Sequence, residues 1–197
     1  MRKIPVVELL LVLSALVNAT QAYRIYQLTS SLSALKSEGQ LQVGARVPPL
    51  LVLDADGNRA EVPVVAALPL IVYWMSPQCG WCTKNEANIR TLAGAVRGRY
   101  RIVALTRSAG DADDYDGIAR MGIPVLGEPD AATARQYHFG GTPQTIVIGA
   151  EGAVAKVWTG AYRATLETEV ERYFAVDLPG LPTESSEQAS KGSGSSR

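Results

Sequence analysis

The sequence predicts a domain of the α/β or α+β class, in which a sheet packs against helices. Short apolar runs alternate with helical patterns along the middle of the chain, which is the order of elements expected in this class. Residues 68–75 read Leu-Pro-Leu-Ile-Val-Tyr-Trp-Met, a continuous apolar run typical of a central strand covered on both faces. A hairpin and a closing helix over residues 145–174 complete the pattern.

The expected elements follow one another without an internal repeat. Asp56-Gly57 and Glu151-Gly152 are turn sequences, so the strands beside each should form a hairpin. Strands are predicted at 50–53, 60–64, 68–75, 100–106, 123–126, 145–148 and 154–158. Helices are predicted from Cys79 to about Val96 and at 111–121, 131–137 and 164–174.

The two ends of the 197-residue chain differ from its middle. The N-terminus is apolar, and the C-terminus is rich in Ser, Gly and Glu, a composition that does not form a core. We therefore expect an anchor or signal at 1–24, a stalk at 25–42, a folded domain at 43–176 and a disordered tail at 177–197. The folded region, roughly 135 residues, is long enough to bury a core.

The N-terminal segment is predicted to be a membrane anchor. Arg2 and Lys3 precede an apolar stretch at 4–23, and at ~1.5 Å per residue this stretch reaches roughly 30 Å, the thickness of a bilayer core. Tyr23 and Tyr26 would lie at the far interface, where aromatic residues gather. Because basic residues stay on the cytoplasmic side, the domain would lie in the periplasm or otherwise outside the cytoplasmic membrane.

Two other interpretations of this segment stay open. Its uninterrupted apolar core, residues 9–17, has the length of a signal-peptide h-region, and Ala19 and Ala22 are small enough for a cleavage site. Cleavage there would give a secreted protein. The segment would otherwise be a buried helix of a cytosolic protein.

Charge and cysteine usage narrow the function. The chain has 19 basic residues (Lys and Arg) and 19 acidic ones (Asp and Glu), and no basic patch stands out. We therefore expect no nucleic-acid partner. The chain has two cysteines, Cys79 and Cys82. A disulfide across two residues closes a very small loop and adds little stability, so the pair indicates chemistry rather than structural crosslinking.

The Cys79-Gly80-Trp81-Cys82 motif is the predicted catalytic site and redox-active disulfide. At the start of a helix, unpaired N–H groups and the positive end of the dipole stabilise a thiolate at Cys79. Cys82, one turn later on the same side and more buried, is the resolving thiol. Trp81 is expected to face solvent and form part of a substrate-docking surface.

The second predicted element of the site is Gly140-Gly141-Thr142-Pro143. We expect a cis peptide bond between Thr142 and Pro143, directly before the strand at 145–148. Such a bond lets the preceding residue offer a strand-like edge to an extended substrate. Thr142 and Pro143 are therefore predicted to bind substrate.

We expect no cofactor and no metal. A CxxC motif can be half of a zinc site, but the chain offers no other cysteine and one histidine, His138. One alternative from another functional class stays open: Cys79, Cys82 and His138 as soft and imidazole ligands of a copper-binding or metallochaperone module.

These motifs together resemble the TlpA/ResA branch of the thioredoxin superfamily, which holds membrane-tethered periplasmic disulfide reductases, with the MauD-like redoxins as close relatives. The resemblance covers about residues 43–174. It implies a thioredoxin-like fold, with a central mixed sheet flanked by helices, an added N-terminal β-hairpin and an insertion around 107–137. The matching stretches are Val43-Gly44 with Pro48, Asp56-Gly57, Tyr73-Trp74 through Cys82, and Tyr137 through Thr145.

The resemblance also implies a function. The protein would reduce disulfides of protein substrates such as apocytochrome c or copper-site proteins, with electrons from a membrane donor and with its N-terminal helix in the membrane. A disulfide-forming oxidase is the open alternative, because direction depends on the reduction potential and the recycling partner. A peroxidase is a weaker match: Ser76 lies three residues before Cys79, but Val72 occupies the place of the proline such enzymes need.

Three positions depart from the family pattern. Val72 or Tyr73 occupies the place of the buried acid that assists proton loss from the second cysteine. Asn85 stands three residues after Cys82, where the family often has Glu, and Ala87 replaces the usual helix-kinking proline. A carboxylate proton relay is therefore not expected from these positions.

Overall fold

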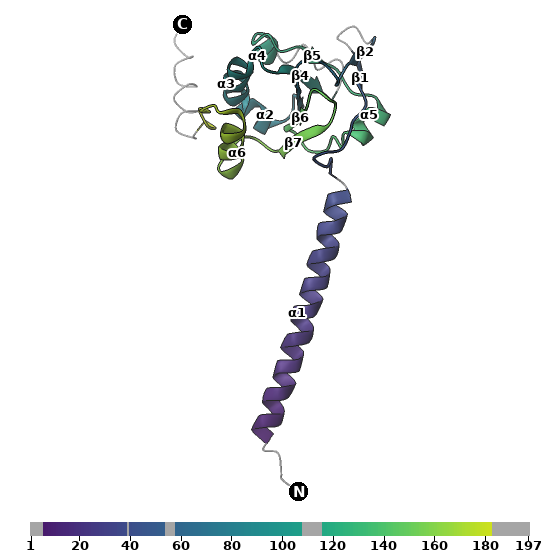
Figure 1. The fold of residues 1–197 in the computed structure, drawn as a ribbon. Helices are drawn as coiled ribbons and strands as arrows, with labels where there is room; N and C mark the ends of the chain where they lie inside the picture. Colours follow the sequence, from purple (N-terminus) through teal and green to yellow (C-terminus); the bar gives the residue numbers. More distant parts are fainter. Residues whose placement is uncertain (1–5, 39, 54–57, 108–115, 183–197) are drawn as a thin grey trace. The chain divides into compact units, whose positions relative to one another are not determined.

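The computed structural model describes residues 6–38, 40–53, 58–107 and 116–182. The chain divides into two compact units, Met1–Gln40 and Leu41–Arg197, which we describe separately. Figure 1 follows both units from the N-terminus in purple to the C-terminus in yellow.

The first unit consists of one helix, α1 (Val6–Glu38). The helix ends at Glu38, and it runs without interruption through residue 24, where the anchor was expected to give way to a stalk. Among the described residues, no helix is both long and apolar enough to cross a membrane. The membrane anchor predicted at 1–24 is therefore not confirmed.

The second unit is built on a five-stranded mixed sheet of order β5-β4-β3-β6-β7. The central strand β3 (Leu70–Met75) runs parallel to β4 (Arg101–Thr106), which in turn pairs in parallel with β5 (Val125–Leu126). On its other side β3 is antiparallel to β6 (Gln144–Ile148), and β6 forms the predicted hairpin with β7 (Val154–Thr159). The predicted α/β class with a mixed central sheet is confirmed.

Strand β3 is the middle strand of the sheet, and every one of its residues is buried. Alternate side chains point to opposite faces of a sheet, so this apolar run contributes to both cores of the domain. Ile71, Tyr73 and Met75 belong to one core, and Leu70, Val72 and Trp74 to the other.

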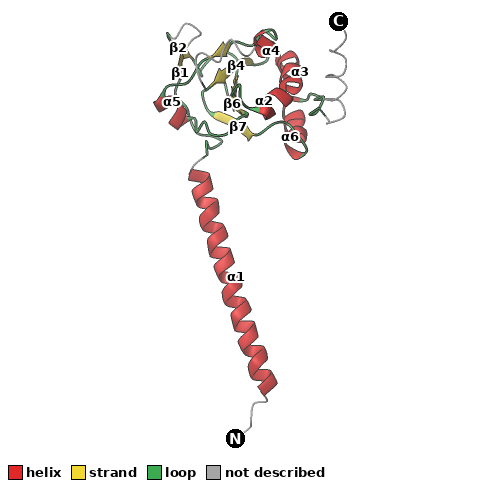
Figure 2. Ribbon diagram, turned by 180° about the vertical axis from the view of Figure 1, so that it is seen from behind, coloured by secondary structure: helices red, strands yellow, loops and turns green. Residues whose placement is uncertain are grey.

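Two sets of elements cover the two faces (Figure 2). The Tyr73 face packs against helices α2 (Gly80–Lys84), α3 (Glu86–Val96) and α6 (Thr165–Phe174), with Ile118 of the short helix α4 (Asp116–Ala119). The opposite face packs against a separate antiparallel hairpin and helix α5. The hairpin joins β1 (Leu50–Leu53) to β2 (Arg59–Val62), and α5 comprises Ala131–Gln136.

One predicted helix differs clearly from the observed structure, and three predicted segments lie partly or wholly outside the described residues. The helix expected from Cys79 to Val96 is divided at Asn85, which is both the C-cap residue of α2 and the N-cap residue of α3. Only the last part of the helix expected at 111–121 is described, because residues 108–115 lie outside the described part of the chain. The hairpin turn at 54–57 and most of the predicted tail, residues 183–197, also lie outside it.

We expect a fragment of residues 40–182 to fold without helix α1. The described side chains of both cores come from residues from Leu41 onward, so the fragment keeps all of them. The fragment should unfold in one cooperative transition, with a Tm within roughly 4 °C of the full chain, equivalent to about 1 kcal/mol. Circular dichroism melts of the two proteins measure this, and a fragment with no cooperative transition would show that α1 supports the domain.

Candidate functional site

The two cysteines form a disulfide at the start of helix α2. Cys79 is the N-cap residue, and its Sγ lies 3.1 Å from the backbone nitrogen of Cys82, which donates to it. Cys79 is half-buried, whereas Cys82 is only 5% exposed. In the reduced protein the same N–H would donate to the Cys79 thiolate, together with the positive end of the helix.

The end of strand β3 positions Cys79. The strand ends at Met75, and the turn at 76–78 brings the chain back so that the Cys79 N–H donates to the Ser76 carbonyl at 3.0 Å. The Ser76 hydroxyl and the side chain of Gln78 lie 3.0 Å apart within this turn. The rigid central strand therefore delivers the motif to the carboxyl end of the sheet, a usual position for functional sites in sheets with parallel strands.

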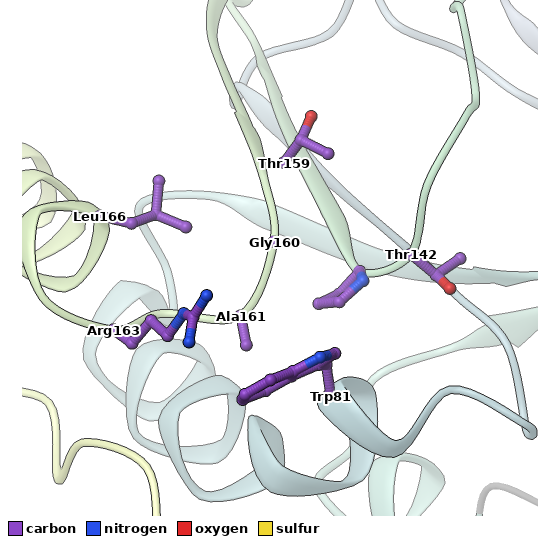
Figure 3. Close-up of a pocket in the computed structure, with 8 residues that line it drawn as sticks. Trp81, Thr142, Thr159, Gly160, Ala161, Arg163 and Leu166 are labelled. Atoms are coloured by element: carbon purple, nitrogen blue, oxygen red, sulfur yellow. The ribbon is translucent and has the colours of Figure 1, made fainter.

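The Thr142–Pro143 loop lies beside the motif. The peptide bond between these residues is cis, as predicted. Strand β6, which follows the loop, pairs Gln144 with Trp74 at the end of β3, so the loop lies next to the turn that carries the cysteines. Trp81, Thr142 and Pro143 line one pocket of about 260 Å³ (Figure 3). The structure thus brings the three predicted substrate-binding residues together.

A buried network of neutral polar groups joins the segments around the site. The Oδ1 atom of Asn85 accepts from the backbone nitrogen of Tyr162 at 2.9 Å and from Asn88 Nδ2 at 3.0 Å. Asn88 Nδ2 also lies 3.3 Å from the carbonyl of Tyr162, and the Tyr162 hydroxyl pairs with Thr145 Oγ1 at 2.7 Å. Asn85 Nδ2 lies 3.5 Å from the hydroxyl of Tyr73. All five residues are 2% exposed or less.

This network contains no group that titrates near neutral pH. Of the two positions considered for a buried acid, Tyr73 lies in the same core as Cys82 and Val72 faces the opposite core. Burial raises the pKa of Tyr73 and of Tyr162 well above the ordinary value, although a hydrogen bond to each opposes the shift. None of the buried polar side chains in the described chain is a carboxylate. The core beneath Cys82 is therefore polar but uncharged.

Two cations that the sequence analysis did not single out lie against Trp81. The Arg163 guanidinium carbon is 4.8 Å from the centre of the indole ring, and Lys84 Nζ is 5.7 Å from it. Lys84 is three residues after Trp81 on one helix, a spacing that signals contact. Arg163 comes from the loop before α6, and no local pattern could have paired it with Trp81.

His138 does not join the cysteines. It is an exposed residue of the loop after α5, with a positive φ of 50°. Within the described residues no group of three or more His, Cys, Asp or Glu side chains is placed to hold a metal ion. The copper site considered from Cys79, Cys82 and His138 is therefore not formed.

Comparison with solved structures identifies the fold. The chain matches the thioredoxin domain of a thiol-disulfide oxidoreductase from Bacteroides vulgatus with a TM-score of 0.53 and 17% identity, over 68% of this chain and 99% of that one. It matches a protein assigned as thiol:disulfide interchange protein DsbE from Chlorobium tepidum with a TM-score of 0.53 and 18% identity, over 69% and 96%. A peroxiredoxin-like protein from Aquifex aeolicus gives 0.52 and 14%, over 68% and 86%.

These likenesses show that the domain has the thioredoxin fold, as the sequence predicted. A scan against protein-family models and a search of curated proteins give no match. Because the matched structures include both oxidoreductases and a peroxiredoxin-like protein, the fold does not select the reaction. The reaction must be argued from the site.

Replacing Asn85 with Ala should destabilise the domain by about 2–4 kcal/mol. The substitution leaves the buried N–H of Tyr162 and the amide of Asn88 without their acceptor, and each such group costs about 1–3 kcal/mol. Urea unfolding of the oxidised protein measures the loss. The control is Thr83→Ala, an exposed position on α2 that should change stability by less than about 0.5 kcal/mol; equal effects of the two variants would contradict a structural role for the network.

The domain should also lose stability in alkali. Burial raises the pKa of Tyr73, Tyr137 and Tyr162, so the unfolded chain releases these protons first, at its ordinary tyrosine pKa of about 10. Their contribution is therefore fully present below pH 10 and falls above it, by about 1 kcal/mol per buried tyrosine between pH 10 and 11. Urea midpoints at pH 8, 10 and 11 test this, and a midpoint that is constant over this range would contradict it. Tyr73→Phe should reduce the slope.

Proposed function

We propose that this protein is a thiol–disulfide oxidoreductase that reduces disulfides of protein substrates. The observation that carries the proposal is the unequal environment of its two sulfurs: Cys79 caps helix α2 and is accessible, while Cys82 is buried one turn later. Disulfide exchange needs this combination of an accessible thiolate and a protected resolving thiol. The oxidoreductase titles of the matched thioredoxin-fold structures support it.

The reaction begins with the pair in its dithiol state. The Cys79 thiolate attacks one sulfur of the substrate disulfide, a mixed disulfide forms, and the other substrate sulfur leaves as a thiolate that takes up a proton. The Cys82 thiol then loses its proton, and its sulfur attacks Cys79 Sγ. This step releases the second substrate thiol and leaves the Cys79–Cys82 disulfide. Two electrons have passed to the substrate, and a dithiol donor returns them by the same exchange in reverse.

We assign further roles to the residues around the cysteines. The backbone of Thr142, beside Pro143, offers an edge to an extended substrate segment, and the indole of Trp81, 47% exposed, gives that segment an apolar surface. Because the core beneath Cys82 is uncharged, we infer that water or the substrate thiolate, and no buried carboxylate, accepts the Cys82 proton.

We further propose that the domain works outside the cytosol, with N-terminal helix α1 as its tether and a membrane protein as electron donor. The support is the apolar part of α1: Leu10, Leu11, Val12, Leu13, Leu16 and Val17 are each 49–65% exposed. A helix segment that is apolar on all sides is typical of a buried or lipid environment. Proteins that receive a metal or haem at their reduced cysteines would be fitting substrates.

Substitution of each cysteine should separate the two roles. Cys79→Ser should reduce the rate of insulin-disulfide reduction with a dithiol donor to background, because it removes the attacking sulfur. Cys82→Ser should leave the first step intact and accumulate a mixed disulfide between Cys79 and the substrate. Nonreducing gels and intact-mass measurements detect this adduct.

Equal trapping by the two variants, or trapping by neither, would contradict the assigned roles. Alkylation of living cells, quenched with acid, tests the direction: a reductase keeps the Cys79–Cys82 pair mainly as dithiol. A pair that is mainly oxidised in cells would favour disulfide formation instead.

A further inference from the structure

The pocket beside the redox pair carries one formal charge, that of Arg163. The other described residues that line it are uncharged, among them Trp81, Thr142, Pro143 and Gly160. Figure 3 shows the Arg163 side chain extending toward Trp81 and Ala161 at one side of this pocket. Its volume of about 260 Å³ lies below the roughly 300–1,000 Å³ usual for small-molecule sites. The pocket thus has the size for a side chain of a bound peptide.

The charge of Arg163 is not neutralised within the described chain. No carboxylate pairs with it, and its contact there is the Trp81 ring. Two of the three carboxylates of helix α6 are engaged elsewhere: Glu169 lies against Lys156 and the indole nitrogen of Trp158, and Glu171 accepts from the backbone of Leu178. The third, Glu167, does not line the pocket. Among the described residues Arg163 therefore lines the pocket without a carboxylate partner.

Helix α6 begins beside Arg163. Its N-cap residue, Ala164, has no side-chain oxygen to accept from the first turn, and the N–H groups of Leu166 and Glu167 donate instead to the Arg163 carbonyl. The Glu167 carboxylate in the first turn offsets the partial positive charge of the helix end. Arg163 and Leu166 both line the pocket, so the guanidinium is the charge that the pocket presents.

The loop that carries Arg163 is held in place from two sides. The backbone nitrogen of Gly160 donates to the Pro143 carbonyl at 2.7 Å, and the backbone nitrogen of Tyr162 donates to Asn85 Oδ1 at 2.9 Å. Stacking on Trp81 restricts the guanidinium further. A cation that is already ordered loses less entropy when it binds a carboxylate, so this arrangement favours recognition.

We propose that this pocket selects substrates that carry an acidic residue close to the disulfide to be reduced. The inference rests on the proposed reductase function and adds the substrate class. A substrate segment along the Thr142 edge places the residues beside its cysteine next to Trp81 and Arg163, since all three line one pocket. The Arg163 guanidinium forms paired hydrogen bonds with an Asp or Glu side chain there. A basic residue at that position is repelled.

The experiment uses the full-length protein, reduced beforehand, and a set of short peptides with one internal disulfide. The peptides carry Asp, Asn or Lys at each of the two positions on either side of the first cysteine. Second-order rate constants come from stopped-flow tryptophan fluorescence. Each rate is divided by the rate of the same variant with hydroxyethyl disulfide, a neutral substrate with no side chain to place in the pocket.

For at least one position the wild-type protein should prefer Asp over Asn by roughly fivefold at low salt, the scale of one partly exposed ion pair. The preference should shrink in 0.5 M salt because of screening, disappear in Arg163→Gln and turn toward Lys in Arg163→Glu. Arg172→Gln, on an exposed position of the same helix outside the pocket, is the matched control and should keep the wild-type preference.

Equal relative rates for the Asp, Asn and Lys peptides at every position would overturn the proposed recognition and leave the reductase function standing. If the Asp preference survives in Arg163→Gln, another part of the surface causes the preference, and the proposal is overturned as well. Failure to reduce any peptide or hydroxyethyl disulfide would instead overturn the reductase function, and the proposed recognition with it.

Discussion

The side-chain amide of Asn85 connects the parts of the molecule on which the site depends. Its oxygen accepts hydrogen bonds from the backbone N–H of Tyr162 and from the side chain of Asn88. This one atom therefore connects the residue between α2 and α3 to the loop after β7. In the same loop, the backbone N–H of Gly160 donates a hydrogen bond to the Pro143 carbonyl. The helix that carries the cysteines, the cis-proline loop and the loop that carries Arg163 are therefore held together by a few buried hydrogen bonds. Buried bonds of this kind are costly to break, which favours a single arrangement.

The choice of neutral groups in this network has a chemical consequence. An acid beneath Cys82 would change its charge with pH, and the energy of the thiolate would change with it. Tyr73 and Asn85 occupy that region here, and burial raises the pKa of Tyr73 still further from neutrality. The buried groups beneath Cys82 then contribute fixed dipoles, as the start of α2 does at Cys79, and none of them is an ionising carboxylate.

The surface around the pair is asymmetric. On the side of the pocket, Trp81 lies under the Arg163 guanidinium and near Lys84, whereas the backbone at Thr142, the proposed substrate edge, is uncharged. The uncharged edge suits any extended backbone, because main-chain hydrogen bonds do not depend on sequence. Discrimination between substrates must come from the flanking side chains, and the pocket places a cation where such a side chain would lie.

Local patterns in the sequence determined much of this protein. The apolar run at 68–75 predicted the central strand, and the Glu151-Gly152 turn predicted the last hairpin. The CxxC motif predicted the Cys79–Cys82 disulfide, and Thr142-Pro143 predicted the cis bond. These features depend on residues close in sequence. The order of the elements along the chain then limits which strand orders the sheet can adopt. The tertiary structure alone decided the rest. Asn85 meets Tyr162, and Trp81 meets Arg163, only after β3, β6 and β7 pair, so no local period in the sequence records these contacts. The helix is divided at Asn85, the residue that binds this distant loop, and no proline stands there.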